Sequence, residues 1–315
     1  MESSTLEYIY SKDNQTIKRA VSLKQRKFRQ KYNEYLVEGI RLINDLLDVE
    51  AVKIVFIKES KTDATDLKAL LEKAQAIVRA RVFIVEDSVF AKLEDTVHSQ
   101  GVIGIAEKSI HNLEESSFDD GLYITIDGVQ DPGNLGTIIR TAVAAGAKGI
   151  FLLKGTVDVY NEKVVRSTMS ALQHIPIYED LTADDFNRIV PKLKEADLVV
   201  FASPLYFWTI SSKLKAFIER FYCIAQRDET PPYGRYEKYP VKDAALLMTS
   251  ADDFFWTFEQ AVSYYQFAIV NYIGFTDKGM LLAGGCGDTN GKPNIRSTAH
   301  LKSAYEFGKN IYHND

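Results

Sequence analysis

The stretch that decides the fold is IDGVQDPGNLGTIIRTA, residues 126–142, because it changes from a strand pattern to a helix pattern within a few residues. Its apolar start continues LYITIDGV, which is typical of a buried strand. The Asp-Pro-Gly-Asn segment predicts a turn, and IIRTA predicts a helix. Gly133 and Gly136 let the backbone approach a ligand, and the helix start leaves free N–H groups for an anion or a hydroxyl. These residues alone leave open whether the turn binds a ligand or is only structural.

The same alternation of strands and helices continues on both sides of this stretch. Between residues 34 and 107, EYLVEGIRLINDLLD, TDLKALLEKAQAIVRA and SVFAKLED have helical spacing, whereas AVKIVFIKES, RVFIVED and GVIGIAEK are typical of strands. After residue 122, the strands GIFLLKG, HIPIYE, ADLVVFAS, DAALLMTS and GMLLAGG are apolar on both faces, as in a covered parallel sheet. We therefore expect an α/β protein: a small N-terminal α/β domain (1–107), a polar linker (108–120), and a doubly wound, mostly parallel sheet. RDETPPYGRYEKYPVKD (227–243) predicts a surface excursion.

Composition excludes several classes of protein. The chain has 315 residues, 46% hydrophobic content and two cysteines, Cys223 and Cys286, which are too few for a disulfide framework and lack metal-ligand spacing. Neither a signal peptide nor a stretch of about 20 apolar residues occurs, so we expect a cytoplasmic protein without a membrane segment. No metal site is expected, and the five scattered histidines are given no catalytic role.

A local basic segment stands out against the net charge of −5. Nine basic and three acidic residues lie between Lys12 and Arg41. Such a segment suits contacts to a nucleic-acid backbone, since each cation that neutralises a phosphate releases condensed counterions. A solvated helix face is the alternative. The residues predicted to contact RNA are Lys18, Arg19, Lys24, Arg26, Lys27 and Arg29.

Two motifs resemble one known family. DGVQDPGNLGTIIRTAVAAG resembles the first signature motif of the SpoU/TrmH class of RNA ribose 2′-O-methyltransferases, and GTVDVYNEKVVRSTMSALQHIPI (155–177) resembles the second. IKRAVSLKQRKFRQKYNEYLVEGIRLI is similar to the small substrate-binding domain that precedes the catalytic domain in that class. The resemblance covers residues 8–180, and several ordered motifs are more specific than a single one.

The resemblance implies roles for individual residues. Asn134 and Arg140 would stand at the reacting ribose, with Arg140 as a phosphate clamp, because arginine holds its proton too tightly to act readily as a base. Arg166 and Ser167 would line the same cleft, and Gly155 would approach S-adenosylmethionine. Ser170 stands where a glycine is usual. The implied partner is rRNA or tRNA, and the class also implies a homodimer through its knot-side interface.

Part of the family pattern is missing. Members of the class close the cofactor pocket with a later G-x-E-x-x-G loop and a final S-L-N motif, which thread the chain into a trefoil knot. Neither motif follows residue 177. We therefore expect no trefoil knot and an incomplete S-adenosylmethionine pocket. Activity should be weak or absent, because methyl transfer requires donor and acceptor at near-attack distance.

A different pattern begins at ADLVVFASPLYFWTISSKLKAFIERF (196–221), where a strand precedes a loop with a hydroxyl, a proline and aromatic residues. Such a loop suits a planar ring ligand, although an aromatic core cluster is the alternative. From Asp184 to Asn310 the chain resembles flavodoxin-like NAD(P)H-dependent flavin reductases and iron–sulfur flavoproteins. That resemblance implies FMN as a cofactor, but the phosphate-cradling loop has no counterpart, and GGCGDTNGKP (284–293) is expected to be a plain loop. The residues that would border the isoalloxazine are Ser203, Pro204, Leu205, Tyr206, Trp208, Thr249, Ser250 and Ala251.

The junction is HIPIYEDLTADDFNRIV, residues 174–190, a pattern typical of a strand that leads into a helix at DDFNRIV. Residues 121–180 would be the first half of a methyltransferase domain and residues 181–315 the second half of a flavodoxin-like domain. Each half leaves apolar strands that need neighbours, so we expect one composite sheet. The leading hypothesis is an RNA-binding protein of the methyltransferase class with a replaced cofactor half. The alternatives are an FMN-binding oxidoreductase and a non-functional fusion or engineered chimera. The helix expected over DDFFWTFEQAVSYYQFAIVNYIGF is predicted to pack in the core.

Overall fold

The structure is a computed structural model that describes residues 6–77, 80–96, 99–113, 116, 118–182, 195–223, 242–287 and 298–311. The chain divides into two compact units, residues 1–181 and 182–315. Three expectations lie wholly or partly outside the described residues: the helix at DDFNRIV, most of the excursion at 227–243, and the second part of the loop at 284–293.

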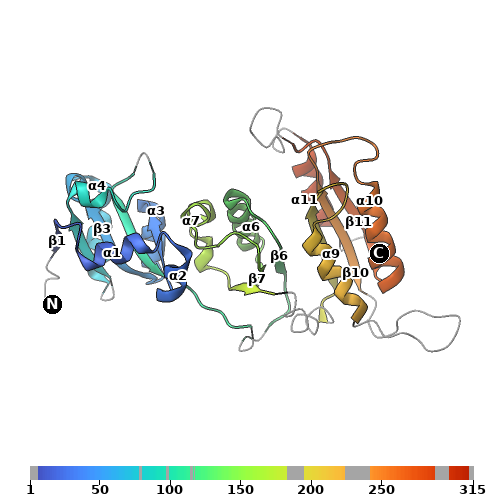
Figure 1. The fold of residues 1–315 in the computed structure, drawn as a ribbon, viewed down its shortest axis with the longest axis horizontal. Coiled ribbons are helices and arrows are strands. Elements are labelled where there is room, and N and C mark those ends of the chain that lie inside the picture. Colours follow the sequence, from blue (N-terminus) through green and yellow to red (C-terminus); the bar gives the residue numbers. More distant parts are fainter. Residues whose placement is uncertain are drawn as a thin grey trace. The chain divides into compact units, whose positions relative to one another are not determined.

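The N-terminal domain is built on a five-stranded mixed sheet with the order β1-β4-β3-β5-β2 (Figure 1). β4 pairs in parallel with β1 and β3, whereas β5 pairs antiparallel with β3 and β2. The strands predicted at AVKIVFIKES, RVFIVED and GVIGIAEK are confirmed as β3, β4 and β5. The five strands are β1 (Glu7–Ile9), β2 (Glu34–Glu38), β3 (Val52–Lys58), β4 (Arg81–Val85) and β5 (Val102–Glu107).

Helices cover both faces of this sheet because alternate strand residues point to opposite sides. Val55 and Ile57 of β3 pack in one hydrophobic cluster with α3 and α4, whereas Phe56 packs in a second cluster with α1 and α5. Asn14 caps α1 by accepting hydrogen bonds from the N–H groups of Thr16 and Ile17. The helices are α1 (Gln15–Ser22), α2 (Arg26–Tyr32), α3 (Ile40–Asp48), η1 (Glu59–Lys61), α4 (Thr65–Ala76) and α5 (Asp87–Phe90).

The segment EYLVEGIRLINDLLD is not a single helix, so the sequence-based expectation is wrong there. Glu34–Glu38 forms β2, which pairs along its length with β5, and the helix begins only at Ile40. Gly39 separates the two elements with a φ of +113°, a conformation that suits glycine. Tyr35, Leu36 and Val37 are all buried, so sheet packing on both faces outweighs the helical spacing of this segment.

The rest of the first unit is a three-stranded parallel sheet with the order β6-β7-β8. Ile126 and Ile150 of this sheet belong to the same hydrophobic cluster as Ile43 of α3, so the two sheets of this unit share one core. The elements are β6 (Tyr123–Ile126), α6 (Pro132–Ala144), β7 (Gly149–Leu153), α7 (Glu162–Thr168), η2 (Ala171–Gln173) and β8 (Ile177–Leu181).

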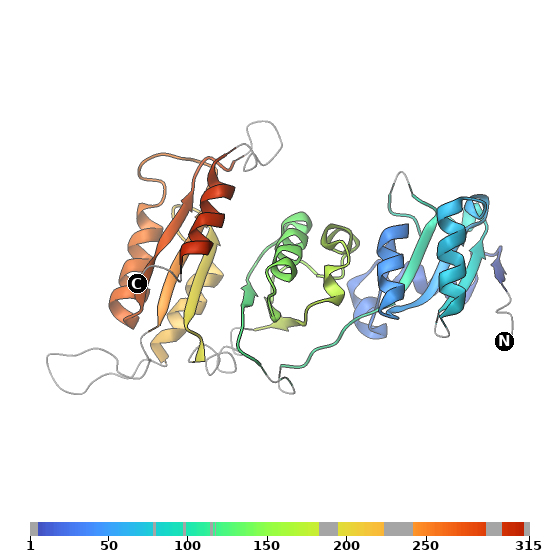
Figure 2. The same cartoon turned by 180° about the vertical axis from the view of Figure 1, so that it is seen from behind.

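The second unit contains another three-stranded parallel sheet, with the order β11-β10-β9. Figures 1 and 2 show α9 and α11 on opposite sides of this sheet. Leu246 of β10 and Tyr265 of α10 lie in a hydrophobic cluster of their own. The elements are β9 (Leu198–Pro204), α9 (Ser212–Glu219), η4 (Arg220–Cys223), β10 (Asp243–Thr249), α10 (Glu259–Tyr265), the π-helix η5 (Gln266–Ile273), β11 (Thr276–Ala283) and α11 (His300–Asn310).

Two further expectations need correction, although the α/β class with parallel sheets is confirmed. The described strands form two separate three-stranded sheets and not one composite sheet. In the described residues β6, β7 and β8 pair only with one another, as do β9, β10 and β11, and the buried residues of β10 have their own hydrophobic cluster. In addition, α10 begins only at Glu259, and Phe254, Phe255 and Trp256 before it are exposed and do not pack in the core.

The contact between α6 and α7 gives the first prediction. A Cβ atom on Gly136 would lie 1.7 Å from Oγ and 3.0 Å from the carbonyl carbon of Ser167. We expect Gly136→Ala to lower the unfolding free energy by about 1–3 kcal/mol, because the two helices must move apart. Gly308→Ala is the control: Gly308 is exposed in α11 and nothing lies within 4 Å of the added atom, so stability should stay equal or rise slightly. Thermal unfolding followed by circular dichroism would measure both, and equal effects of the two changes would contradict this packing.

Candidate functional site

The carboxyl ends of β6 and β7 are joined by hydrogen bonds between the loops that follow them. The Val157 N–H donates to the Val129 carbonyl at 2.9 Å, and the Gly128 N–H donates to Thr156 Oγ1 at 3.1 Å. The Gln130 side chain donates to the Gly155 carbonyl. Ligands of parallel sheets usually lie at this edge, and these bonds give it a fixed shape.

Asn134 and Arg140 are both exposed on α6, which begins at this edge. Asp131 caps the helix by accepting a hydrogen bond from the Asn134 N–H at 2.7 Å, which leaves the Asn134 amide side chain exposed. Arg140 Nη1 lies 3.3 Å from the sulfur of Met169, a weak acceptor. Among the described residues Arg140 has no carboxylate partner, so its charge is available to an anionic ligand.

Ser167 lies against the start of the same helix. Its Oγ is 3.1 Å from the carbonyl oxygen of Pro132 and 2.9 Å from that of Val164, so its proton is held by backbone acceptors. The structure therefore brings Ser167 next to α6, where Asn134 and Arg140 lie, and gives it a packing contact with Gly136. A direct role of Ser167 in binding stays a prediction.

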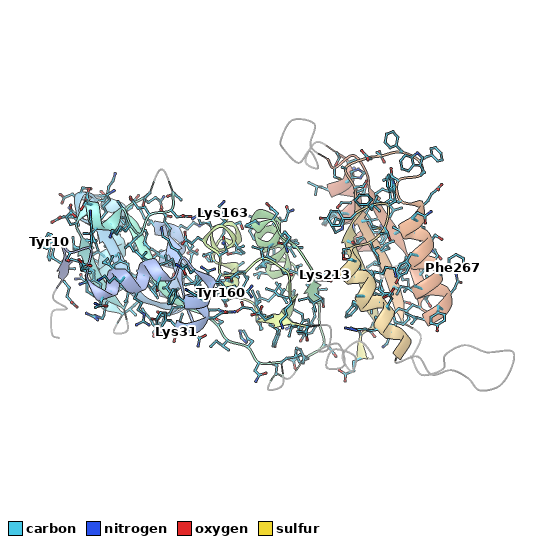
Figure 3. The ribbon with its side chains drawn as sticks, in the orientation of Figure 1. Tyr10, Lys31, Tyr160, Lys163, Lys213 and Phe267 are labelled. Carbon is cyan, nitrogen blue, oxygen red and sulfur yellow. The ribbon has the colours of Figure 1, made fainter. Side chains whose placement is uncertain are left out.

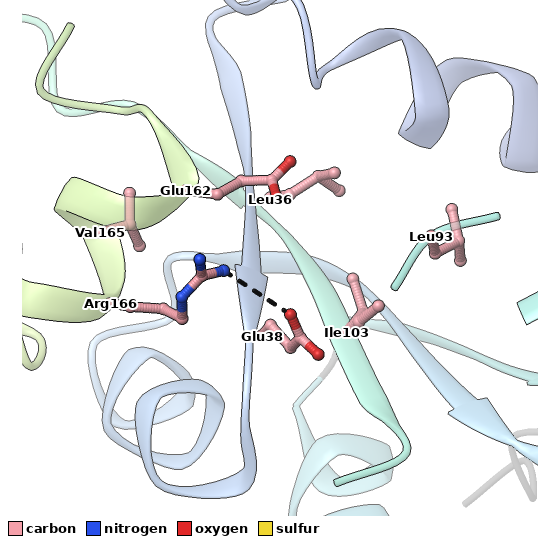
Figure 4. Close-up of a pocket in the computed structure, with 7 residues that line it drawn as sticks. All are labelled: Leu36, Glu38, Leu93, Ile103, Glu162, Val165 and Arg166. Atoms are coloured by element: carbon pink, nitrogen blue, oxygen red, sulfur yellow. Dashed lines mark ion pairs between the residues drawn. The ribbon is translucent and has the colours of Figure 1, made fainter. Parts of the chain in front are cut away.

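Arg166 contacts the N-terminal domain, whereas Ser167 contacts α6. Figure 4 shows Arg166 in a small cavity lined by Leu36, Glu38, Leu93, Ile103, Glu162, Val165 and Arg166. Its Nη2 lies 3.5 Å from Asp95 Oδ2, and its Nη1 lies 3.8 Å from Glu38 Oε2. These contacts hold Arg166 against the N-terminal domain, and the expectation that it lines one cleft with Arg140 stays a prediction. The carboxylates around it were not identified from the sequence, because they are far apart along the chain.

Three acidic residues surround Arg166, and two of them share a proton. Burial raises the pKa of Glu162 to about 7, and its hydrogen bond to the Asp95 carboxyl adds to the increase. That same hydrogen bond, together with the Arg166 guanidinium and Lys24, lowers the pKa of Asp95. Glu162 is therefore the proton donor of the pair and Asp95 the charged acceptor.

The raised pKa of Glu162 predicts a pH-dependent stability. Between its ordinary value of 4.5 and about 7, the folded protein keeps a proton that the unfolded chain has released. The stability that this group contributes is fully present below pH 4.5 and is lost as the pH rises toward 7. We expect Glu162→Gln, which preserves the hydrogen bond to Asp95, to remove this part of the pH dependence. Unfolding midpoints in guanidinium chloride between pH 5 and 8 would measure it.

The control for that experiment is Glu7→Gln, because Glu7 is exposed and pairs with Arg81. The Glu7→Gln variant should follow the pH dependence of the unchanged chain. Parallel curves for Glu162→Gln and the unchanged chain would show that Glu162 does not hold its proton in this range.

Most of the predicted RNA-binding cations lie on the surface of α1 and α2. Lys18, Arg19, Arg26 and Lys27 are exposed, and Lys24 is half-buried. Several of them have intramolecular partners: Lys18 pairs with Asp13 at 2.8 Å, Arg26 with Asp180 at 2.5 Å, and Arg19 with Glu34 at 2.7 Å. The exposed pairs of Lys18 and Arg26 are weak and can exchange for phosphate. Arg19 is instead bound by both carboxylate oxygens of Glu34, whose side chain is only 3% exposed, so it is held in place. Binding of RNA by this surface stays a prediction.

Arg29 differs from the other cations because it is only 4% exposed. Its guanidinium donates to Asp158 at 2.5 and 3.1 Å and to the carbonyl oxygens of Leu23 and Lys24 at 2.7 and 2.9 Å. The structure gives Arg29 an internal role, which the basic pattern of the sequence did not reveal.

The residues expected to border a flavin lie at the carboxyl ends of β9 and β10. Ser203 and Ser250 are buried and hydrogen-bond to the backbone, whereas Tyr206 and Trp208 are exposed. Pro204 and Thr249 are exposed strand ends, and Leu205 donates its N–H to the Thr249 carbonyl. Rings for stacking are present, but these loops would border only the isoalloxazine, and the loop that cradles the FMN phosphate has no counterpart in the sequence. The described loops therefore do not fit FMN as a whole.

Neither a metal site nor a membrane span is found in the part of the chain that the structure describes. No group of three or more His, Cys, Asp or Glu side chains is placed to hold a metal ion there. Within the same residues, every helix is too short or too polar to cross a bilayer.

Comparisons with known proteins match most of the first unit and the beginning of the second. Residues 14–104 match the MRM3-like substrate binding domain, and residues 121–217 match the SpoU rRNA Methylase family. The 23S rRNA (guanosine(2553)-2′-O)-methyltransferase RlmP of Bacillus subtilis (strain 168) is 32% identical over 173 residues, 55% of this chain and 64% of that protein. The mitochondrial rRNA methyltransferase 3 of Homo sapiens is 31% identical over 197 residues, 60% of this chain and 46% of that protein. The chain thus spans less than two thirds of the length of these relatives.

Solved structures show the same fold class. An AdoMet-bound rRNA methyltransferase from Sinorhizobium meliloti is 26% identical with a TM-score of 0.58, covering 96% of this chain and 98% of that one. The SpoU methyltransferase AviRb from Streptomyces viridochromogenes, in complex with AdoMet, is 17% identical with a TM-score of 0.57. At that identity the likeness shows the fold alone.

Residues 14–104 are thus similar to MRM3-like substrate-binding domains and residues 121–217 to SpoU methylase domains, and the relatives found are rRNA methyltransferases. The predicted resemblance to this class is confirmed. The expectation that this resemblance ends near residue 180 is not confirmed, because the family match continues to residue 217. These comparisons give no support to the flavodoxin-like resemblance, to a chimera, or to a loss of activity, which stay hypotheses.

Proposed function

We propose that this chain binds RNA and transfers a methyl group from S-adenosylmethionine to a ribose 2′-hydroxyl. The observation that carries this proposal is that Asn134 and Arg140 are exposed on the helix that begins at the carboxyl end of β6, where the matched family motif lies. The relatives that act on rRNA support the choice of RNA as the substrate.

The geometry suggests how each residue would act. Arg140 would hold a phosphate next to the reacting ribose, because its guanidinium is charged and exposed and has no carboxylate partner among the described residues. The Asn134 amide would orient the 2′-hydroxyl, since its backbone is fixed by Asp131. Ser167 would support both by packing against the start of α6.

The residues of the β7 loop fit one side of S-adenosylmethionine. Gly155 is exposed and has a φ of +98°, a conformation that suits glycine. Because glycine has no side chain, a flat ligand can approach the backbone at this position. The β6 loop is hydrogen-bonded to it through Gln130 and Thr156, which gives the surface a fixed shape. When bound, the cofactor supplies an electrophilic methyl group.

The role of Arg140 can be tested by methyl incorporation. The full chain would be incubated with an unmodified rRNA transcript and S-adenosylmethionine carrying a labelled methyl group. We expect Arg140→Ala to lower incorporation by about 100-fold, because a positioned charge near the reacting group is lost. Arg81→Ala is the matched control, since Arg81 is equally exposed but pairs with Glu7 on the N-terminal sheet. No incorporation by the unchanged chain, or equal loss in both variants, would refute the proposal.

RNA binding through α1 and α2 can be tested separately from activity. We expect the affinity for an RNA hairpin to fall steeply with salt, and each phosphate contact removed should reduce the slope of log K against log[salt] by roughly 0.7–0.9. The variant Lys18→Ala, Arg26→Ala, Lys27→Ala should therefore bind more weakly and with a smaller slope. Lys68→Ala is the control, because α4 packs on the other face of the N-terminal sheet. An unchanged slope in the triple variant would place the RNA elsewhere.

A further inference from the structure

Six aromatic side chains lie exposed on two loops of the second unit. β9 and β10 pair in parallel up to Pro204 and Thr249, so the loops that follow leave the sheet side by side. Contiguous exposed apolar side chains mark interaction sites more often than isolated ones do. We call the set the aromatic patch; its members and exposed fractions are Tyr206 (62%), Phe207 (92%), Trp208 (45%), Phe254 (58%), Phe255 (92%) and Trp256 (38%).

Ring contacts join the two loops into one surface. The ring centroids of Trp208 and Trp256, one from each loop, are 5.9 Å apart. Phe254 stacks on Trp256 at 5.3 Å with the planes only 5° apart, and Phe207 meets Trp208 edge-on at 6.1 Å. The patch therefore presents both ring faces and ring edges to solvent.

The backbone of this patch is strained, although the strain buries no apolar surface. Phe207 and Trp208 have φ values of +46° and +59°, in the left-handed region that bulky residues avoid. Tyr206 and Thr209 hold the turn by exchanging two backbone hydrogen bonds, at 3.0 and 3.1 Å. Asn and Gly are the usual residues in such turns. Burial of Phe207 does not offset this strain, because its side chain is 92% exposed, and such outliers cluster at ligand-binding sites.

The charged residues of the two loops that carry the patch all have one sign. Residues 203–211 and 250–259 contain no Lys, Arg or His but contain Asp252, Asp253 and Glu259, all of which are exposed. A ligand that carries phosphate is disfavoured by these carboxylates. A cation is favoured twice, because ring faces attract positive charge and the carboxylates pair with it.

We propose that the aromatic patch binds an arginine-containing segment of a protein partner. A guanidinium is planar, so it can stack on an exposed ring while its N–H groups bond a carboxylate such as Asp252. The six rings on two loops form a surface that several side chains of an extended segment can contact. This surface is larger than the contact area of one small cation. The proposal is independent of methyl transfer and of RNA binding by the first unit.

Tryptophan fluorescence can test this proposal directly, because the chain has only two tryptophans and both are in the patch. The full chain would be titrated with a short peptide of alternating arginine and glycine. We expect a saturable change in fluorescence, weaker binding when lysine replaces arginine, and no binding when glutamate replaces it. Higher salt should weaken the interaction.

Two variants separate the contributions of the rings and the charges. Phe207→Ala with Phe255→Ala removes the two most exposed rings, keeps both tryptophans, and should weaken binding by about tenfold. Asp252→Asn with Glu259→Gln should weaken binding severalfold and reduce its salt dependence. The control is Phe267→Ala: Phe267 is 69% exposed on η5, outside the patch (Figure 3), and its loss should leave binding unchanged.

Three outcomes would overturn the proposal. One is an equal response to the glutamate peptide, which would show that charge is not recognised. The second is that the double phenylalanine variant binds as well as Phe267→Ala. The third is that FMN or an RNA oligonucleotide gives the saturable change while the arginine peptide gives none, which would assign the patch to a ring or nucleotide ligand.

Discussion

The buried ion pair between Arg29 and Asp158 connects the two domains of the first unit. Arg29 lies on α2 of the N-terminal domain, and Asp158 lies in the loop after β7; their side chains are 5% and 11% exposed. Removing one partner of such a pair leaves an uncompensated buried charge, at a cost of about 3–5 kcal/mol. Asp158 also accepts a hydrogen bond from the Tyr160 N–H at 2.9 Å, so the same carboxylate fixes the loop that follows Gly155. The proposed RNA surface and the proposed cofactor loop are therefore held in a defined relation.

Neutral contacts add to this ion pair and explain why the first unit has one core. Tyr35 of β2 and Tyr160 pack with ring centroids 4.8 Å apart. The Tyr35 hydroxyl accepts a hydrogen bond from Gln173 at 2.7 Å, and the Tyr160 hydroxyl donates to the Ser109 carbonyl at 3.2 Å. Lys108 lies 4.4 Å from the centre of the Tyr160 ring. The polar linker predicted at 108–120 thus begins with residues that belong to the interface, so the N-terminal domain is not loosely tethered.

The sequence predicted best what depends on local pattern. Short β-branched runs identified β3, β4 and β5. The Asp-Pro-Gly-Asn segment marked the change from strand to helix, although Pro132, Gly133 and Asn134 are the first residues of α6 and not a turn before it. Prediction from the sequence was wrong where residues far apart in the chain determine the local structure. EYLVE, predicted as part of a helix, forms a strand because it pairs with β5. A run of lysine and arginine residues indicates local positive charge but does not identify the partner of each residue. The buried ion pair of Arg29 could therefore not be predicted from the sequence. Glu38, Asp95 and Glu162 are too far apart in the chain to form a recognisable motif. The division into two sheets could not be predicted either, because it depends on which strands pair.

The end of α7 shows how a departure from a family pattern can be compensated. Met169 and Ser170 both adopt left-handed φ values, +48° and +73°, and neither is glycine. Each residue of this kind costs about 1–2 kcal/mol. Ser170 Oγ, however, bonds the Asp45 carboxylate of α3 at 2.6 Å, and a charge-assisted hydrogen bond offsets a cost of that size. The turn so held presents Met169, whose sulfur lies 3.3 Å from Arg140. A serine in place of glycine therefore links α3 of the N-terminal domain, through the strained end of α7, to the side chain proposed to hold the RNA phosphate.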